Sequence, residues 1–122
     1  MIRSRRVSSR EVVEAHIRQV ERVNPTVRAV VRDRFAQARA EADRADARLA
    51  QDDIDALPPF HGVPCSIKES FAVEGMPWTA GLVARKEVVA DFDAVTVTRL
   101  RAAGAIPIAV TNTSELCMWM ES

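Results

Sequence analysis

One lysine interrupts a short apolar stretch of this 122-residue chain, in the segment HGVPCSIKES at residues 61–70. The chain carries 15 arginines and only two lysines, Lys68 and Lys86, so arginine is its usual cation. An arginine stays protonated in proteins, whereas a desolvated lysine can lose its proton and act as a base or a nucleophile. Lys68 is therefore a candidate for proton transfer. The alternative is a lysine at the end of an exposed strand, with its ammonium group in water.

The remaining residues that could bind metal or form disulfides give no comparable signal. Cys65 and Cys117 are too few and too far apart in the sequence to indicate a zinc site or a disulfide framework. Each is interpreted as a small buried apolar residue. His16 and His61 have no cysteine or carboxylate at the spacing of a metal site. We expect no metal and no cofactor.

Composition and charge exclude several classes of protein. The 17 basic residues balance the 17 acidic ones, so the net charge gives no indication of binding to nucleic acid or to an anionic membrane. No apolar run approaches the roughly 20 residues of a transmembrane helix, and the start of the chain lacks the apolar core of a secretory signal. A cytoplasmic protein the size of one domain, with no transmembrane segment, is expected.

The first elements are predicted from caps and periodicity. A capping box formed by Ser8 and Glu11 opens an amphipathic helix over residues 8–23, which Asn24-Pro25 is expected to end. The valine-rich residues 26–33 then predict a short strand. Apolar residues at steps of three and four predict a long, mostly solvated helix over residues 33–50.

The second half of the chain repeats the alternation. A strand is predicted over residues 63–70, then a loop, a helix over residues 91–104 and a strand over residues 105–110. Asp91 or Asp93 is expected to cap the helix and Gly104 to end it.

Two further signals concern the last strand and the segment after it. Pro107 lacks an N–H and so indicates an edge strand or a bulge. A final helix is expected to begin in TNTSELCMWMES, capped by Asn112, Thr113 or Ser114, and the chain is expected to stop within it. Strands that alternate with helices predict an α/β architecture with a mixed or parallel sheet and helices on both faces.

Several of these segments together resemble a known family. HGVPCSIKES, then GMPWTAGL, then RLRAAGAIPIAVTNTSELCMWMES resemble the amino-terminal part of an amidase signature enzyme, a serine amidohydrolase that cleaves carboxamides. SSREVVEAHIRQVERVNPTVRAVV resembles the first helix and strand of that family. The wording of the last segment is similar to the fatty-acid amide hydrolase branch. The resemblance implies an α/β/α fold with a mixed sheet flanked by helices, of which residues 1–122 form the amino-terminal portion of one domain, incomplete in this chain.

The family uses a Ser-Ser-Lys triad, and the resemblance identifies Lys68 as the triad lysine. A neutral lysine takes the proton of a bridging serine, which activates a nucleophilic serine for attack on the amide carbonyl. Both serines belong to a Gly/Ser-rich segment of the type GGSSGG, which residues 1–122 do not contain. The serines in the second half of the chain are Ser66, Ser70, Ser114 and Ser122. None of them lies in such a glycine-rich turn. These 122 residues alone are therefore expected to be inactive.

The resemblance also places four residues beside the substrate, namely Thr79, Gly81, Cys117 and Met118. A turn would equally explain Gly81, and an ordinary core position would explain Cys117 and Met118. Trp78 and Trp119 fit either a substrate-facing or a core position.

The sequence leaves two hypotheses for function. In the first, the chain is part of an amidohydrolase that acts on a small-molecule amide and supplies its lysine. In the second, it is a non-enzymatic subunit or pseudo-enzyme module that binds a partner through an unfinished sheet edge. A homo-oligomer is a separate alternative. Strands without neighbours leave main-chain groups unpaired, so the isolated chain is expected to be insoluble, oligomeric or only partly ordered.

Overall fold

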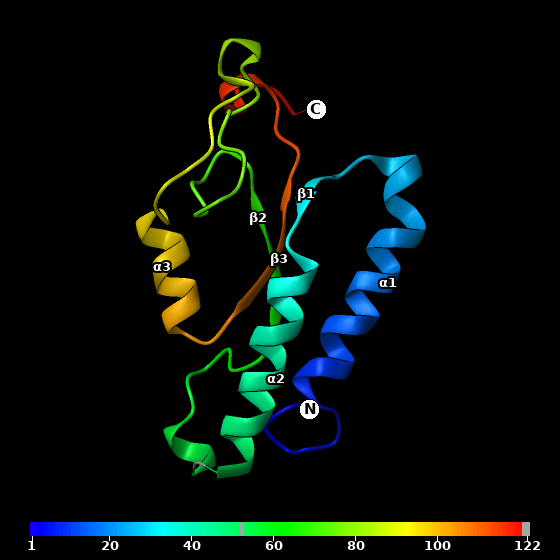
Figure 1. The fold of residues 1–122 in the computed structure, drawn as a ribbon, viewed down its shortest axis with the longest axis vertical. Helices are drawn as coiled ribbons and strands as arrows, with labels where there is room; N and C mark the ends of the chain where they lie inside the picture. The colour runs from blue at the N-terminus through cyan, green and yellow to red at the C-terminus, as the bar shows by residue number, and fades with distance from the viewer. Residues whose placement is uncertain (52, 121–122) are drawn as a thin grey trace.

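The computed structural model describes residues 1–51 and 53–120, which form three strands, three helices and three short 3-10 turns (Figure 1). The predicted α/β alternation is confirmed. The helices are α1 (Ser9–Val27), α2 (Phe35–Gln51) and α3 (Val95–Ala102); the strands are β1 (Val30–Asp33), β2 (Pro64–Lys68) and β3 (Ile106–Thr111); the 3-10 turns are η1 (Ile54–Ala56), η2 (Val83–Arg85) and η3 (Glu115–Cys117).

Helix α1 begins at the predicted capping box but runs past its predicted end. The Ser8 and Glu11 side chains each accept a hydrogen bond from the other's backbone N–H, at 3.0 and 2.8 Å. The prediction that Pro25 ends the helix is wrong, because a proline in the last turn removes a single N–H. The Asn24 side chain also binds both backbone groups of Val30, at 2.8 and 3.0 Å. The helix therefore occupies part of the segment predicted as strand, and β1 starts only at Val30.

The sheet is mixed, as predicted, with the order β1-β3-β2. Strand β1 is antiparallel to β3, and β2 is parallel to it. Pro107 therefore lies in the central strand, so an edge position is wrong. The alternative of a bulge is confirmed: Cys65 pairs with Pro107, the next residue Ser66 pairs with Ala109, and Ile108 is the extra residue. The bulge accommodates a residue that cannot donate to the ladder.

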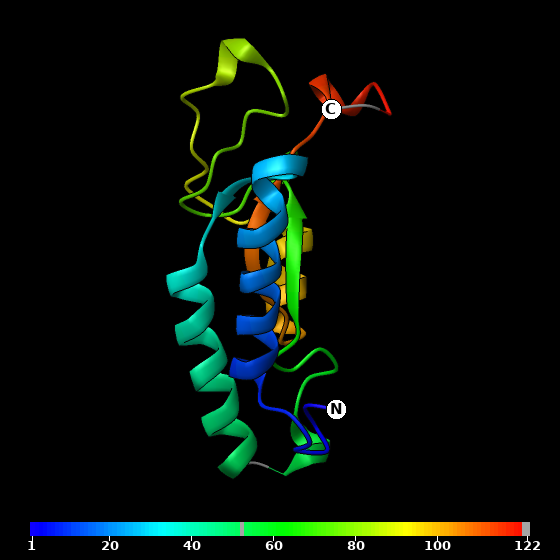
Figure 2. The same cartoon turned by 90° about the vertical axis from the view of Figure 1, so that its right-hand side faces the viewer.

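Helices cover both faces of the sheet (Figures 1 and 2). One core cluster joins α1 and α2 to β3 and consists of Val13, Ile17, Ala38, Ala42, Ile106, Ile108 and Ala109. The other joins α3 to β2, β3 and the loop after β2, and consists of Ile67, Val73, Met76, Val97 and Val110. Ile108 and Ala109 are adjacent yet share a cluster because the bulge lies there.

The start of α3 differs from the prediction. Ala94, and not Asp91 or Asp93, is the N-cap residue. The Asp93 carboxylate is used elsewhere, since it accepts the backbone N–H of Glu74 at 2.8 Å and lies 2.8 Å from Nε of Arg101. The predicted stop is confirmed, because Gly104 follows the helix with φ +91°.

The final predicted helix does not form in the described residues. Only the single turn η3 is present, and both Leu116 and Cys117 have positive φ, at 52° and 59°. Ser114 precedes this turn, but its hydroxyl makes no cap. The hydroxyl instead donates to the carbonyl of Trp119 at 2.8 Å and accepts the N–H of Trp119 at 3.2 Å. A long-range bond from Leu116 N–H to the carbonyl of Ala80, at 2.8 Å, replaces a helical one.

Candidate functional site

The carboxyl ends of β2 and β3 lie side by side, with Lys68 paired to Thr111. Both strands point to the same end of the molecule, where the loop 69–90 and the segment 112–120 extend beyond the sheet (Figure 1). This end of a parallel strand pair is where α/β proteins usually place their sites.

Lys68 is the last residue of β2, and its side chain is exposed. The preceding residue, Ile67, is buried against α3 and fixes the strand end. Lys68 thus lies at the end of a firmly packed strand, close to Cys117 of the segment 112–120.

Cys117 is one of the residues near Lys68. The Thr113 hydroxyl lies 3.2 Å from Sγ and does most to lower the pKa of the Cys117 thiol, with smaller contributions from Ser70 and from the positive charge of Lys68. Cys117 is exposed, so the prediction of a buried residue is wrong. Its place in an open turn, and not in a packed helix, is the reason. Cys65 is half-buried, and burial raises the pKa of its thiol.

Thr79 and Gly81 form a turn that joins the two loops. The Thr79 hydroxyl accepts the N–H of Gly81 at 3.1 Å. Gly81 has φ +75°, and a Cβ there would lie 2.9 Å from backbone atoms of Ser114 and Glu115. Only glycine permits this approach without strain. The geometry accounts for Gly81 as a turn residue whose backbone touches the segment that carries Cys117.

Met118 follows Cys117 and is 75% exposed. It lines a hollow of about 430 Å³ together with Glu115, Leu116 and Trp119. Trp119 is likewise 76% exposed, so neither side chain is a core residue in the described part of the chain.

Trp78 has a structural setting. Its Nε1 donates to the carbonyl of Ser70 at 3.2 Å, and its ring packs edge-to-face with that of Phe92, the two ring centres 5.5 Å apart. The Arg85 guanidinium stacks over the ring at 4.6 Å from its centre. These contacts order the loop 69–90.

Glu69 is the residue of this region that sequence reasoning missed. It is only 2% exposed, and its carboxylate accepts the backbone N–H of Thr79. The available signal was an acidic residue directly after Lys68, at the end of an apolar strand.

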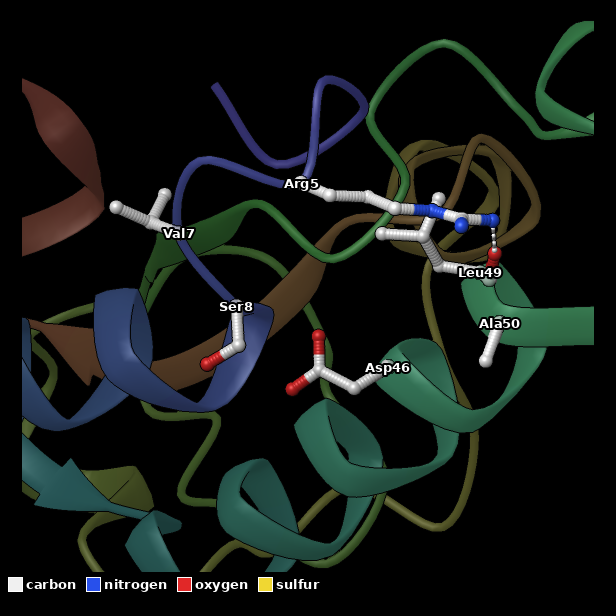
Figure 3. Close-up of a pocket in the computed structure, with 6 residues that line it drawn as sticks. All are labelled: Arg5, Val7, Ser8, Asp46, Leu49 and Ala50. Carbon is white, nitrogen blue, oxygen red and sulfur yellow. Dashed lines mark hydrogen bonds between the residues drawn. The ribbon is translucent and has the colours of Figure 1, made fainter.

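A second hollow, of about 260 Å³, lies where the start of α1 meets the end of α2 (Figure 3). The Asp46 carboxylate there accepts the N–H groups of Ser9 and Arg10 at 2.6 and 3.0 Å. The Arg5 guanidinium reaches the carbonyl of Leu49 at 2.8 Å. These hydrogen bonds fasten the start of α1 and the residues before it to the end of α2, so we interpret this hollow as structural.

The described residues, 1–51 and 53–120, lack a metal-binding cluster and a membrane-spanning helix. No group of three or more His, Cys, Asp or Glu side chains is arranged to hold a metal ion there. Among the helices of this region, none combines the length and the apolar character needed to cross a membrane.

Comparison with known proteins agrees with the resemblance seen in the sequence. The profile of the Amidase family matches residues 11–122. Fatty-acid amide hydrolase 2-B of Danio rerio is 49% identical over 99% of this chain, and fatty-acid amide hydrolase 2 of Homo sapiens is 43% identical over all of it. An acylamidase of Rhodococcus erythropolis is 38% identical over 93%. The chain spans about a quarter of the length of these relatives, 24% in each case.

Solved structures show the same likeness. A chain from a vestigial protein complex related to an s-triazine catabolic enzyme superposes with a TM-score of 0.87 and 36% identity, over 93% of this chain and 25% of its own length. A bacterial aryl acylamidase of the amidase signature family superposes with a TM-score of 0.81 and 27% identity, over 93% of this chain and 24% of its own.

Proposed function

Because the chain belongs to the amidase signature family, we propose that it provides the catalytic lysine and part of the substrate-binding surface of a carboxamide hydrolase. The observation that carries this proposal is the position of Lys68. It ends a packed strand beside Thr111, where the loop 69–90 and the segment 112–120 converge.

In the proposed reaction, neutral Lys68 accepts a proton from a bridging serine, which then takes the proton of the nucleophilic serine. The nucleophile attacks the amide carbonyl, and the leaving amine receives a proton returned along the same path. Residues 1–122 contain no Gly/Ser-rich segment, so we assign both serines to a segment of that type elsewhere in the enzyme. That segment also supplies the N–H groups that stabilise the oxyanion.

To act as a base, Lys68 needs an environment that favours the neutral amine over the charged ammonium form. Its side chain is exposed among the described residues. Polypeptide that covers this end of the sheet would remove water from the amine and favour the neutral base. The proposal therefore assigns two tasks to the covering segment, namely the serines and the desolvation of Lys68.

The segment 112–120 provides the apolar side chains that we assign to substrate binding. Cys117 lies near Lys68, and the hollow lined by Leu116, Met118 and Trp119 presents apolar side chains. We assign Thr79, Gly81, Cys117 and Met118 to the border of the substrate site. An apolar acyl group fits such a lining, in keeping with relatives named fatty-acid amide hydrolases.

The test compares the chain's two lysines in a polypeptide that includes the Gly/Ser-rich segment. Lys68→Arg keeps the charge but cannot serve as a base, so kcat/KM for a fatty-acyl anilide should fall by about 10⁴-fold. Lys86→Ala is the matched control, because that side chain is 73% exposed on the loop and should leave the rate unchanged. Near-normal turnover in Lys68→Arg would show that Lys68 is only a charge at a strand end.

A further inference from the structure

Glu69 links the strand that carries Lys68 to the loop that follows it. Its backbone N–H donates to the carbonyl of Thr111 at 2.8 Å, which extends the pairing of β2 and β3 by one residue. Its side chain turns inward, is nearly fully buried, and accepts the backbone N–H of Thr79. The neighbouring Ser70 carbonyl accepts the indole N–H of Trp78 at 3.2 Å. Two adjacent residues after Lys68 thus hold two adjacent residues of the turn.

The turn at residues 78–81 also contacts the segment 114–117, which carries Cys117. The carbonyl of Ala80 accepts the N–H of Leu116 at 2.8 Å. Gly81 packs directly on the backbone of Ser114 and Glu115. A continuous series of hydrogen bonds and backbone contacts therefore runs from Glu69 through the turn to Cys117, whose thiol is close enough to Lys68 to sense its charge.

The Glu69 carboxylate is also poorly satisfied for a buried acid. Its Oε2 is buried and accepts no hydrogen bond within the described residues. Burying an unpaired acceptor destabilises a fold, so stability alone does not explain a glutamate at this position. A requirement for the position of the turn does explain it.

We propose that Glu69 is a positioning residue: its carboxylate locks the turn at residues 78–81 onto the end of β2, and through that turn it fixes the segment 114–117 relative to Lys68. The contacts that carry this inference are all within the chain. The link from Glu69 to catalysis rests on the proposed function, whereas its role in holding the turn and the segment 114–117 in place does not.

Hydrogen–deuterium exchange with mass spectrometry tests the proposal in the polypeptide that includes the Gly/Ser-rich segment, without any need for turnover. Three segments are compared: 77–82, 114–118 and, as an internal reference, the central strand 105–111. In Glu69→Ala, exchange in 77–82 and 114–118 should accelerate at least tenfold while 105–111 stays unchanged. Glu69→Gln should restore protection in both loops, because its amide oxygen can still accept the Thr79 N–H.

Glu87→Ala is the matched control, since the Glu87 side chain lies on the same loop and is 89% exposed. It should change none of the three segments. If Glu69→Ala loosens 77–82 but not 114–118, or neither, the proposal is overturned. If Glu69→Ala loosens all three segments, Glu69→Asp decides, because it keeps the acid but shortens its reach by one methylene. Selective loosening of both loops in Glu69→Asp supports the proposal, and any other pattern overturns it. These outcomes are independent of the Lys68→Arg result, so the two proposals can fail separately.

Discussion

Gly81 lies so close to Ser114 that a Cβ on the glycine would be 2.9 Å from the serine's carbonyl carbon and oxygen. Because both partners in this contact are backbone, neither can move aside without shifting its whole loop. The contact joins the loop after β2 to the segment after β3, although Gly81 and Ser114 are 33 residues apart in the sequence.

We predict that Gly81→Ala destabilises the chain through this contact. Its positive φ alone costs an alanine about 1 kcal/mol, and the clash adds a further 1–2 kcal/mol by analogy with overpacked sites. Urea denaturation followed by tryptophan fluorescence measures the change. Gly75→Ala is a matched control, since Gly75 has nearly the same φ, +76°, but no atom within 4 Å of the added Cβ. Equal losses in the two variants would show that the contact with Ser114 adds nothing.

The two cysteines should differ in reactivity. Cys117 is exposed and the pKa of its thiol is lowered, chiefly by the Thr113 hydroxyl, whereas burial raises the pKa of the Cys65 thiol. The thiolate is the reactive form, so iodoacetamide at pH 7 should alkylate Cys117 at least tenfold faster than Cys65. Peptide mapping by mass spectrometry measures both rates in one sample.

A substitution at Thr113 tests the cause of that difference. Thr113→Val removes the hydroxyl while keeping the shape, so the pKa of Cys117 should rise and its alkylation at pH 7 should slow. The rate at pH 10, where the thiol is ionised in either case, should stay the same. A slower rate at both pH values would indicate a change of access and not of pKa.

Stability should depend on acid pH through Glu14. Arg39 and Arg10 hold the pKa of this carboxyl at about 2, against an ordinary value of 4.5. Their Nε atoms lie 2.7 and 3.0 Å from its Oε1. A lowered folded-state pKa means that the stabilisation is complete above pH 4.5 and is lost as the pH falls toward 2.

Thermal unfolding between pH 6 and pH 2 checks this expectation. The difference in Tm between the unsubstituted chain and Glu14→Gln should be present at pH 6 and should be largely lost by pH 2. In an Arg39→Gln background, which lacks the main cause of the lowered pKa, the same substitution should change the Tm less. A difference of the same size at pH 2 as at pH 6 would mean that Glu14 acts through packing.

The fold was predictable where the signal is local. The capping box of Ser8 and Glu11 and the apolar periodicity of α1 and α2 are readable along the chain, because a helix is stabilised by residues three and four apart. The failures involve distant partners. Asp93 does not cap α3 because Arg101 and the backbone of Glu74 engage it. In place of the final helix, the N–H of Leu116 donates to the carbonyl of the distant Ala80.

The candidate site could be read from the sequence to a similar extent. Residue type and motif single out Lys68 as the candidate, since a chain with 15 arginines has only two lysines. The burial of Glu69 was not identifiable, because its partner, Thr79, is brought to it only by the fold of the loop between them. Gly81 could be recognised as a turn residue, whereas its contact with Ser114 depends on how β2 and β3 are paired.

The extra residue in β3 interrupts the alternation of side chains between the two faces of the sheet. Ile108 and Ala109 both face α1 and α2, and Val110 then faces α3. Deleting Ile108 would leave a regular ladder in which Ser66 still pairs with Ala109, so Ala109 and Val110 would keep their present faces. Deleting Val110, beyond the bulge, would instead turn Thr111, the partner of Lys68, to the other face of the sheet. This strand should therefore tolerate the loss of a residue at the bulge far more readily than the loss of one after it.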